Sequence, residues 1–285
     1  MFSTFLSQRA VIILSGEESI EFLQGLISND ARLLTNGNSI YAALLSPQGR
    51  FQHDFFLIPW RDKIFIDVRS DRANDLFARL KIYRLRSKVE ITIDESVCVA
   101  ALWGGEPVVI EQSDYKIYPD SRLPEIGLRA IGIKDSISNF CQQNSIELVA
   151  EEQYEHFRLS LGVPDTRDMI VEKSLLLECG FEQLHGVDFS KGCYVGQEVT
   201  ARSKFRGQVR KSFYSVRAGA FLPVAGTKIM AADKIIGEMR TSLDNVGLAL
   251  IYNEEYEAAQ NNNTLFLCDG VKVEIIPSEW IKNFK

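Results

Sequence analysis

The sequence predicts an α+β region followed by a small all-β domain. Up to about residue 207, strand patterns alternate with helical patterns in an order typical of α+β proteins. From about Arg210 onward helical periodicity disappears, and six short strands separated by Gly, Asp and Asn follow within about 75 residues. Such a series of strands is typical of a closed barrel or a sandwich. We therefore place a domain boundary near residues 205–212.

The first ninety residues predict a helix-covered β-meander. AVIIL (10–14) is a compact apolar strand, and Ser15 with Glu18 forms a capping-box pattern in front of an amphipathic helix. A second helix is expected from about Ser70 to Leu85. The remaining apolar runs, bounded by turns, are expected to be strands at 39–45, 50–58, 64–68 and 88–93.

The rest of the chain continues with strands and short helices. A helix over 151–162 is expected to stop at Gly162, because Pro164 cannot continue it. Before it, strands are expected at 97–103, 107–111 and 128–133, with a helix near 135–143. The six C-terminal strands are SFYSVRA, TKIMAA, KIIGEMR, VGLALI, TLFLC and VKVEIIP.

Composition and charge exclude several classes of protein. The chain has 285 residues, of which 46% are hydrophobic and 25% charged, and its net charge is −6. A general binder of nucleic acid or anionic membranes would be drawn to a polyanion by excess positive charge, which this chain lacks. No apolar run reaches the roughly 18 residues of a membrane span, and the N-terminus lacks the basic region of a signal peptide.

The five cysteines are odd in number, scattered and without a C-x-x-C pair, which favours a reducing cytoplasm over a disulfide framework. None of the three histidines is spaced to share a metal with them, so no metal site is expected. The sequence also lacks the glycine-rich motifs of nucleotide hydrolysis and hydride transfer.

The stretch KGCYVGQE (191–198) is the strongest candidate for chemistry. It places Cys193 on a loop with Gly192 and Gly196, and only Tyr194 and Val195 could fill a core. Cations near a thiol favour its reactive thiolate form, and Lys191 precedes Cys193 by two residues. A single thiolate cannot hold an iron–sulfur cluster, which takes about four ligands. Cys98, Cys141 and Cys268 lie in apolar patterns and are expected to be core residues.

Positive charge gathers after this loop. Between Lys191 and Lys211 the one acidic residue is Glu198. The window therefore predicts either a local anion site or a solvated face, since charged runs are commonly just surface. The basic residues are Lys191, Arg202, Lys204, Arg206, Arg210 and Lys211.

KGCYVGQE, continued as VTARSKFRG, resembles the signature of the YgfZ family, folate-binding proteins of iron–sulfur cluster maturation. FRLSLGVPD and LLLECGFEQLHGVDF are similar to the same family's approach to that motif. FLQGLISNDARLL and LLSPQGRFQHDFFL are similar both to that family and to its relative, the glycine cleavage T protein, an aminomethyltransferase. The resemblance covers essentially the whole chain.

This resemblance implies a T-protein-like body that encloses a channel for tetrahydrofolate, here residues 1–207 in two interleaved subdomains. Residues 208–285 would form a C-terminal β-barrel. It also implies assembly or repair of [4Fe–4S] clusters in client enzymes, including tRNA-modifying ones, and transient contact with a cluster. Cys193 would be the functional thiol, within a motif of Lys191, Gly192, Tyr194, Gly196, Gln197 and Glu198.

The folate residues carry over only in part. T proteins have an aspartate pair where this chain has His53 and Asp54; these neighbours point to opposite faces of a strand, so only one can face a channel. Leu176 replaces an arginine of the T protein, whereas Glu178 is retained and could accept hydrogen bonds from a pterin edge. Asp54 and Glu178 are the expected pterin contacts. Arg202, Lys204 and Arg206 are expected near the glutamate tail of folate.

Three functions stay open at this point. We expect a cytoplasmic folate-binding maturation factor, with folate and iron–sulfur client or assembly proteins as partners and no direct contact with nucleic acid or membranes. A folate-dependent aminomethyltransferase is the enzymatic alternative, disfavoured because Leu176 replaces the arginine and because T proteins lack the cysteine motif. A docking scaffold without chemistry is the third reading. Whether the chain is an enzyme is left open.

Overall fold

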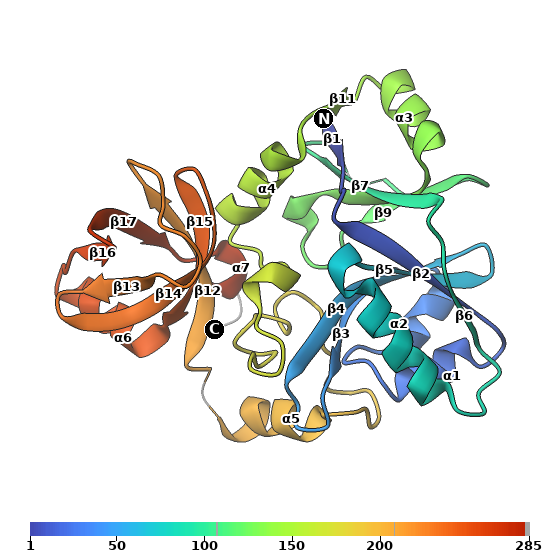
Figure 1. Ribbon diagram of the computed structural model, residues 1–285, viewed down its shortest axis with the longest axis horizontal. Helices are drawn as coiled ribbons and strands as arrows, with labels where there is room; N and C mark the ends of the chain where they lie inside the picture. The colour runs from blue at the N-terminus through green and yellow to red at the C-terminus, as the bar shows by residue number, and fades with distance from the viewer. Residues whose placement is uncertain (107, 208, 283–285) are drawn as a thin grey trace. The chain divides into compact units, whose positions relative to one another are not determined.

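The chain folds into two compact units (Figure 1). A computed structural model describes residues 1–106, 108–207 and 209–282, without the side chains of residues 206 and 282. Unit 1 comprises Met1–Glu151 and Leu184–Gln197, and unit 2 comprises Glu152–Gln183 and Glu198–Lys285. The division at residues 207 and 208 expected from the sequence stays a prediction. None of the described helices is long and apolar enough to cross a membrane.

The first sheet of unit 1 is the predicted meander with two added strands. Its spatial order is β3 (Ile40–Leu45), β4 (Phe51–Trp60), β5 (Lys63–Arg69), β2 (Arg9–Ser15) and β6 (Glu90–Ile93), all antiparallel. Helix α2 (Ser70–Arg84) lies across one face, where Ala73, Leu76 and Leu80 join the main apolar core (Figure 1). The predicted β-meander and its covering helix are thereby confirmed.

The second sheet of unit 1 contains three strands outside the predicted strand ranges: β1 (Phe2–Phe5), β9 (Tyr115–Pro119) and β11 (Glu147–Leu148). Its order is β11, β1, β7 (Val97–Trp103), β10 (Leu128–Ile133), β9 and β8 (Ile110–Glu111). Helix α3 (Lys134–Gln143) packs Ile137 and Cys141 into the core of this sheet, as the pattern near 135–143 predicted. A 3-10 turn, η2 (Pro124–Ile126), precedes β10.

The capping box predicted at Ser15 and Glu18 is wrong. Helix α1 (Ser19–Gln24) has Glu18 as its N-cap residue, without a side-chain cap hydrogen bond. The Glu18 carboxylate instead accepts from the backbone N–H of Lys88, at 2.9 Å. A distant part of the chain therefore uses the side chain that local pattern had assigned to the helix. The 3-10 helix η1 (Ala31–Asn36) follows and ends at Gly37.

A buried layer of charge joins the two sheets of unit 1. Asp67 on β5 accepts from Arg9 of β2 and from Arg129 of β10, each at 2.5 Å. Arg129 also reaches Asp120, which Arg122 holds at 2.9 Å. Buried charges are tolerated when they are paired and hydrogen-bonded. A shift of one sheet against the other would leave some of these charges unpaired, so the network favours the observed packing of the two sheets.

Unit 2 is centred on the predicted barrel. Six antiparallel strands close in the order β12 (Lys211–Ala218), β15 (Val246–Tyr252), β14 (Lys234–Leu243), β13 (Lys228–Ala231), β16 (Phe266–Cys268) and β17 (Val271–Ile276). The expectation that helices are absent here is wrong, because α6 (Asn253–Asn261) packs Tyr256 and Ala259 into the barrel core. The short α7 (Glu279–Lys282) follows the last strand.

The segment before the barrel is held by a buried arginine. Helix α4 (Glu151–Ser160) ends near Gly162, as expected. Arg158, which is 1% exposed, donates to Glu155, to the carbonyl of Val163 and to Asp168 in the 3-10 turn η3 (Thr166–Asp168). The FRLSLGVPD stretch is thus tied into a rigid turn. Helix α5 (Gln197–Arg206), which the sequence pattern did not predict, precedes the barrel.

Candidate functional site: an exposed thiol between buried anchors

Lys191 anchors the start of the cysteine loop. Its ammonium is buried and donates to the carbonyls of Gln24, Ile27 and Asn29, at 2.9, 2.6 and 2.7 Å. Burial lowers the pKa of Lys191 to about 8, although Asp30 and Asp188 act against that shift. The sequence suggested that the charge of Lys191 would favour the thiolate form of Cys193. In the structure the Lys191 ammonium is instead bound by three backbone carbonyls.

The other side of the loop is also fixed. The backbone N–H of Val195 donates to the carbonyl of Gly25 at 3.2 Å, and Tyr194 is buried. Gly196 has φ 79°, and a Cβ there would lie 2.4 Å from the carbonyl oxygen of Ser46. Only glycine fits that close approach without strain. Gln197 closes the turn by accepting from the backbone N–H of Tyr194 at 3.1 Å.

Between these anchors the chain is open. Cys193 and Gly192 are both exposed, and a Cβ at Gly192 would meet nothing within 4 Å. Because residues 191 and 194 to 196 are packed against unit 1, the two residues between them can only protrude. The exposure of Cys193 is therefore built into the loop. Glu198, also exposed, lies in the first turn of α5, where a carboxylate is favoured by the helix dipole.

Residues upstream brace the same loop. The Ser28 hydroxyl donates to the carbonyl of Gly186 at 2.5 Å, and the Asn29 amide donates to the carbonyls of His185 and Tyr41. The Asp188 carboxylate accepts from the backbone N–H groups of Ser190 and Lys191. These contacts give Ser28 and Asn29 of FLQGLISNDARLL a role: they hold the start of the cysteine loop at Gly186 and His185, 158 and 156 residues later in the chain.

Cys193 is a single potential sulfur ligand. In the described part of the chain, no three His, Cys, Asp or Glu side chains gather closely enough to hold a metal ion. The other four cysteines are Cys98, Cys141, Cys179 and Cys268, which are buried or half-buried, and none of the five forms a disulfide. An iron–sulfur cluster needs about four ligands. Cys193 could therefore supply one ligand to a cluster whose other ligands come from another molecule.

Asp54 lies in the interior of unit 1. Its side chain is buried on β4 and accepts from the Tyr41 hydroxyl at 2.8 Å. His53 points to the opposite face, as strand alternation predicted, and donates to Asp75 of α2 at 2.8 Å. Burial, helped by the nearby Arg72, lowers the pKa of His53 to about 4, so this imidazole is neutral at pH 7. His53 is therefore a core residue, whereas Asp54 occupies a distinct polar site with Tyr41.

Glu178 lines a cavity formed entirely within unit 2. The cavity has a volume of about 290 Å³ and combines acceptors with aromatic walls. Gln183 contributes a buried side-chain oxygen that has no hydrogen-bond partner. Burial raises the pKa of Tyr214 to about 12, so its hydroxyl keeps its proton. The lining residues are Leu177, Glu178, Gly180, Gln183, Val209, Ser212, Phe213, Tyr214, Asn253, Glu254, Glu257, Trp280 and Ile281.

This cavity suits the pterin end of a folate. The amino-pyrimidine edge of a pterin presents N–H donors, for which Glu178 and the unpartnered Gln183 oxygen are matching acceptors. Phe213 and Trp280 supply flat apolar surface for a bicyclic ring. Most small-molecule pockets occupy roughly 300–1,000 Å³, so the volume fits a ring system better than a whole folate. The sequence pointed to Glu178 but gave no signal for Gln183.

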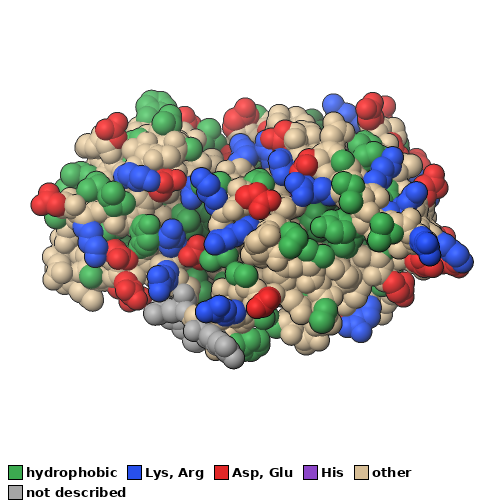
Figure 2. Space-filling model, turned by 60° about the horizontal axis from the view of Figure 1, so that its bottom comes forward, with side chains coloured by type: hydrophobic (Ala, Val, Ile, Leu, Met, Phe, Trp, Pro, Cys, Tyr) green, Lys and Arg blue, Asp and Glu red, His purple; other side chains and the backbone are tan. Residues whose placement is uncertain are grey.

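The described residues of the basic window have different surroundings. Lys204 on α5 pairs with Glu182, and Arg202 is exposed on the same helix. The side chain of Arg206 lies outside the described part of the structure. Lys191 is buried in its carbonyl cage, and Lys211 lies on the barrel. On the face shown in Figure 2, Lys and Arg side chains are interspersed with Asp and Glu. The proposed contacts of Arg202, Lys204 and Arg206 with a folate tail stay predictions.

The chain is similar to a known barrel-domain family and to iron–sulfur cluster assembly factors. The family model described as the CAF17 C-terminal β-barrel domain matches residues 210–283. The mitochondrial iron–sulfur cluster assembly factor IBA57 homolog of Neurospora crassa is 33% identical over 228 residues, which are 73% of this chain and 52% of the relative. Human mitochondrial IBA57 is 27% identical over 283 residues, covering 88% of this chain and 77% of the human protein. The chain spans about half the length of the Neurospora relative.

A solved structure identifies the fold. Glycine cleavage system aminomethyltransferase T from Bartonella henselae matches with a TM-score of 0.75 over 98% of this chain and 85% of that protein, at 16% sequence identity. The predicted T-protein-like α+β fold with a C-terminal barrel is thereby confirmed. The similarity to IBA57 proteins, the barrel model and this shared fold agree: the chain belongs to the IBA57/CAF17 family, to which the YgfZ proteins are homologous.

Proposed function

We propose that this protein assists the assembly or repair of [4Fe–4S] clusters in client enzymes, including tRNA-modifying ones, with Cys193 as the working thiol. The exposed sulfur between two buried anchors carries this proposal. Membership of a family whose named relatives are iron–sulfur cluster assembly factors supports it. The five cysteines without a disulfide fit a reducing compartment, and we keep the cytoplasm as the expected location, although those relatives are mitochondrial.

The chemistry asked of Cys193 is ligation. Its thiol releases a proton to solvent, and the thiolate then replaces one thiolate ligand on an iron of a cluster held by an assembly partner or client. The displaced thiolate leaves and takes up a proton. No electron transfer is required. The anchors hold both ends of the exposed stretch, so only residues 192 and 193 have to be ordered when the sulfur binds, which costs little further entropy.

Cluster transfer in vitro tests this role. A purified client apoenzyme would be supplied with a cluster-bearing donor protein, and recovery of its activity followed with wild type, Cys193→Ser and the matched control Cys98→Ser. We expect at least a tenfold slower recovery for Cys193→Ser and little change for Cys98→Ser, whose sulfur lies against the Gly132 carbonyl. Equal recovery with all three proteins would favour the docking scaffold.

We also propose tetrahydrofolate, or a one-carbon derivative, as the ligand of the cavity in unit 2. Glu178 and Gln183 would hold the pterin edge between the walls formed by Phe213 and Trp280. Asp54 stays a predicted pterin contact from the resemblance alone: it lies in unit 1, it is not among the residues that line this cavity, and its carboxylate accepts from the Tyr41 hydroxyl. The bound folate would supply one-carbon or redox chemistry, while these residues bind and orient it.

Calorimetry with tetrahydrofolate separates the two acidic residues. We expect Glu178→Ala to weaken binding at least tenfold, since a charged acceptor of paired hydrogen bonds is lost. Glu274→Ala, an exposed acid on β17, is the control. Asp54→Asn keeps the size of the side chain and tests the second contact. Equal affinity of wild type and Glu178→Ala would remove Glu178 from the folate site without affecting the proposal for Cys193.

The aminomethyltransferase alternative has the shared fold in its favour and Leu176 against it. Leu176 is 1% exposed, so the position at which T proteins have an arginine is apolar core in this chain. We therefore expect no aminomethyl transfer from a lipoylated carrier protein to tetrahydrofolate. Appreciable turnover in that assay would favour an aminomethyltransferase over a cluster assembly factor.

A further inference from the structure

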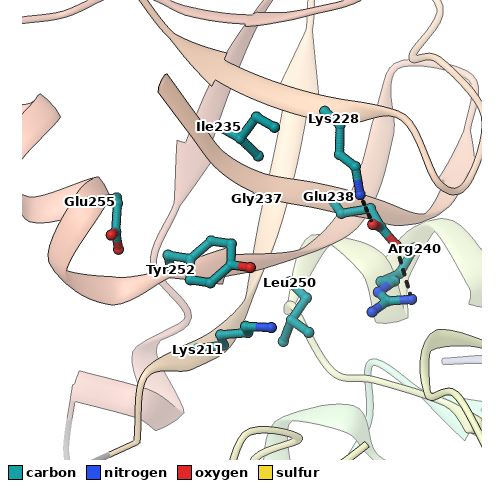
Figure 3. Close-up of a pocket in the computed structure, with 9 residues that line it drawn as sticks. All are labelled: Lys211, Lys228, Ile235, Gly237, Glu238, Arg240, Leu250, Tyr252 and Glu255. Carbon is teal, nitrogen blue, oxygen red and sulfur yellow. Dashed lines mark hydrogen bonds and ion pairs between the residues drawn. The ribbon is translucent and has the colours of Figure 1, made fainter. Parts of the chain in front are cut away.

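The outer face of the barrel carries a second pocket, which none of the roles above uses. It has a volume of about 260 Å³ and is formed by strands β12 to β15 and the first turn of α6 (Figure 3). It lies wholly within unit 2. Its lining combines cations, carboxylates and apolar side chains: Lys211, Lys228, Ile235, Gly237, Glu238, Arg240, Leu250, Tyr252 and Glu255.

Strand register aligns these residues. Lys211 pairs with Tyr252 across β12 and β15, Leu250 pairs with Glu238 across β15 and β14, and Glu238 pairs with Lys228 of β13. Side chains of paired residues lie on the same face of a sheet. The pair Lys211–Tyr252 and the row Lys228–Glu238–Leu250 are therefore two neighbouring rows on the outside of the barrel. The opposite face of β15, with Ala249 and Ile251, fills the barrel core.

Arg240 enters the pocket because β14 is irregular. The register between β14 and β15 shifts between Met239 and Thr241, which leaves Arg240 as the extra residue. Such bulges redirect side chains and are frequent beside binding sites. One guanidinium nitrogen lies 3.2 Å from Glu238, while the buried Nε–H has no hydrogen-bond partner. A ligand in the pocket would meet the terminal guanidinium nitrogens of Arg240, because its Nε is enclosed.

Lys211 is the second unsatisfied cation. Its ammonium lies 4.6 Å from the centre of the Tyr252 ring. It forms no ion pair with a described carboxylate, although its charge helps to lower the pKa of Glu238. Glu238 is already engaged by Lys228 and Arg240, as the dashed lines in Figure 3 show. In Figure 3 the Lys211 ammonium and the Tyr252 hydroxyl both point toward the side of the view on which Leu250 and Arg240 are drawn.

The floor of the pocket is apolar and uncovered. Ile235 is 47% exposed and Tyr252 is 37% exposed, whereas Leu250 between them is buried. A ligand with an apolar body would remove these surfaces from water, which favours binding. Three cations against two carboxylates leave one net positive charge in the lining, and Glu255 is itself paired with Lys234 at 3.5 Å. This balance suits a monoanion better than a dianionic phosphate.

We propose that this barrel pocket binds a carboxylate carried on a compact apolar group, with Lys211 and Arg240 receiving the carboxylate. The same chemistry is presented by a small free acid and by the C-terminal residue of a partner protein when that residue is apolar. The proposal is independent of cluster chemistry and folate binding, so it can fail or succeed without them.

Calorimetry on the chain of 285 residues tests the site with two probes, 3-phenylpropanoate and a short peptide ending in phenylalanine. We expect a dissociation constant of roughly 0.1–1 mM for the small acid. Lys211→Met and Arg240→Met should each weaken binding by about tenfold or more, because a charge-assisted hydrogen bond is lost. Lys272→Met, an exposed lysine on β17, should bind as wild type does.

Matched neutral probes complete the experiment. The corresponding amides, 3-phenylpropanamide and the amidated peptide, should bind at least tenfold more weakly than the acids. A peptide that binds tenfold or more tighter than the small acid identifies a partner's C-terminus as the source; equal affinities identify a free acid. Equal binding of acids and amides, tighter binding of inorganic phosphate, or no effect of Lys211→Met would each overturn the proposal. Lys211 is on the surface, so that variant keeps its fold.

Discussion

The cysteine loop and the barrel pocket both draw on lysines from one basic stretch of sequence, yet they use them in opposite ways. Lys191 turns its ammonium inward onto three backbone carbonyls. Lys211 keeps its ammonium at an open pocket, against the Tyr252 ring. In the first case the charge positions the chain so that another residue, Cys193, is exposed. In the second the charge itself is available to a ligand.

The difference follows from what each lysine meets. Lys191 reaches the C-terminal end of α1, where carbonyls lack intrahelical partners and a cation is favoured. Lys211 is on an outward strand face, where its neighbours are side chains of adjacent strands. Positive charge close together in sequence therefore does not define a common surface, and a charge count over a window cannot distinguish an anchor from a binding group.

The largest expected effect comes from removing the anchor. Lys191→Met leaves three carbonyls without their charged donor, so we expect the free energy of unfolding to fall by about 3–5 kcal/mol. Lys211→Met, by contrast, should change it by less than about 0.5 kcal/mol. Urea denaturation of both variants measures the difference. Similar losses in the two variants would mean that the contrast between the two lysines has no energetic basis.

The pH dependence of stability tests a second buried basic group, His53. The pKa of His53 is about 4 in the folded protein and about 6.5 when unfolded, so below pH 6.5 the unfolded chain binds a proton that the folded chain refuses. Stability should be complete above pH 6.5 and fall by up to about 3 kcal/mol as the pH drops to 4.

His53→Gln is the control for this prediction, because an amide still donates to Asp75 and does not titrate. Denaturation curves at pH 7, 6, 5 and 4.5 should show a flatter dependence for the variant than for wild type. Parallel curves would show that His53 does not titrate as its burial requires.

The two glycines of the loop give the smallest but sharpest comparison. Gly196→Ala forces a side chain onto the Ser46 carbonyl at a left-handed backbone angle, and should cost about 2 kcal/mol. Gly192 directly follows Lys191 and faces open space, so Gly192→Ala should lower the free energy of unfolding by less than about 0.5 kcal/mol. Thermal melts and the alkylation rate of Cys193 would be measured for both. A Gly192→Ala variant as destabilised as Gly196→Ala would contradict the idea that residues 192 and 193 protrude freely.

Local patterns predicted much of the fold. The meander of β3 to β5 and all six barrel strands could be predicted because turn residues bound each apolar run. Helix α6 was missed because only Tyr256 and Ala259 of NEEYEAAQN face the core, too few to show a helical period. The capping box at Ser15 failed because Glu18 binds a backbone group 70 residues away.

The exposed thiol of the candidate site could be predicted from the sequence, but the contacts that hold its loop in place could not. A cysteine between glycines, with few apolar neighbours, indicated an exposed thiol, and Cys193 is exposed. The partners of Lys191 are backbone carbonyls, which leave no side-chain signal in the sequence, and they lie 162 to 167 residues earlier in the chain. Likewise the pocket of Lys211 and Arg240 depends on strand register and on a bulge. Both are properties of tertiary structure.

The long reach of Lys191 also bears on how the protein is made. Proteins are synthesised from the N-terminus, so residues 24–29 leave the ribosome well before the lysine that clasps them. Contacts between residues so far apart in sequence are slow to form. The mature presentation of the sulfur must therefore be among the late events of folding, because Cys193 is not held in place until Lys191 has bound the carbonyls of residues 24–29.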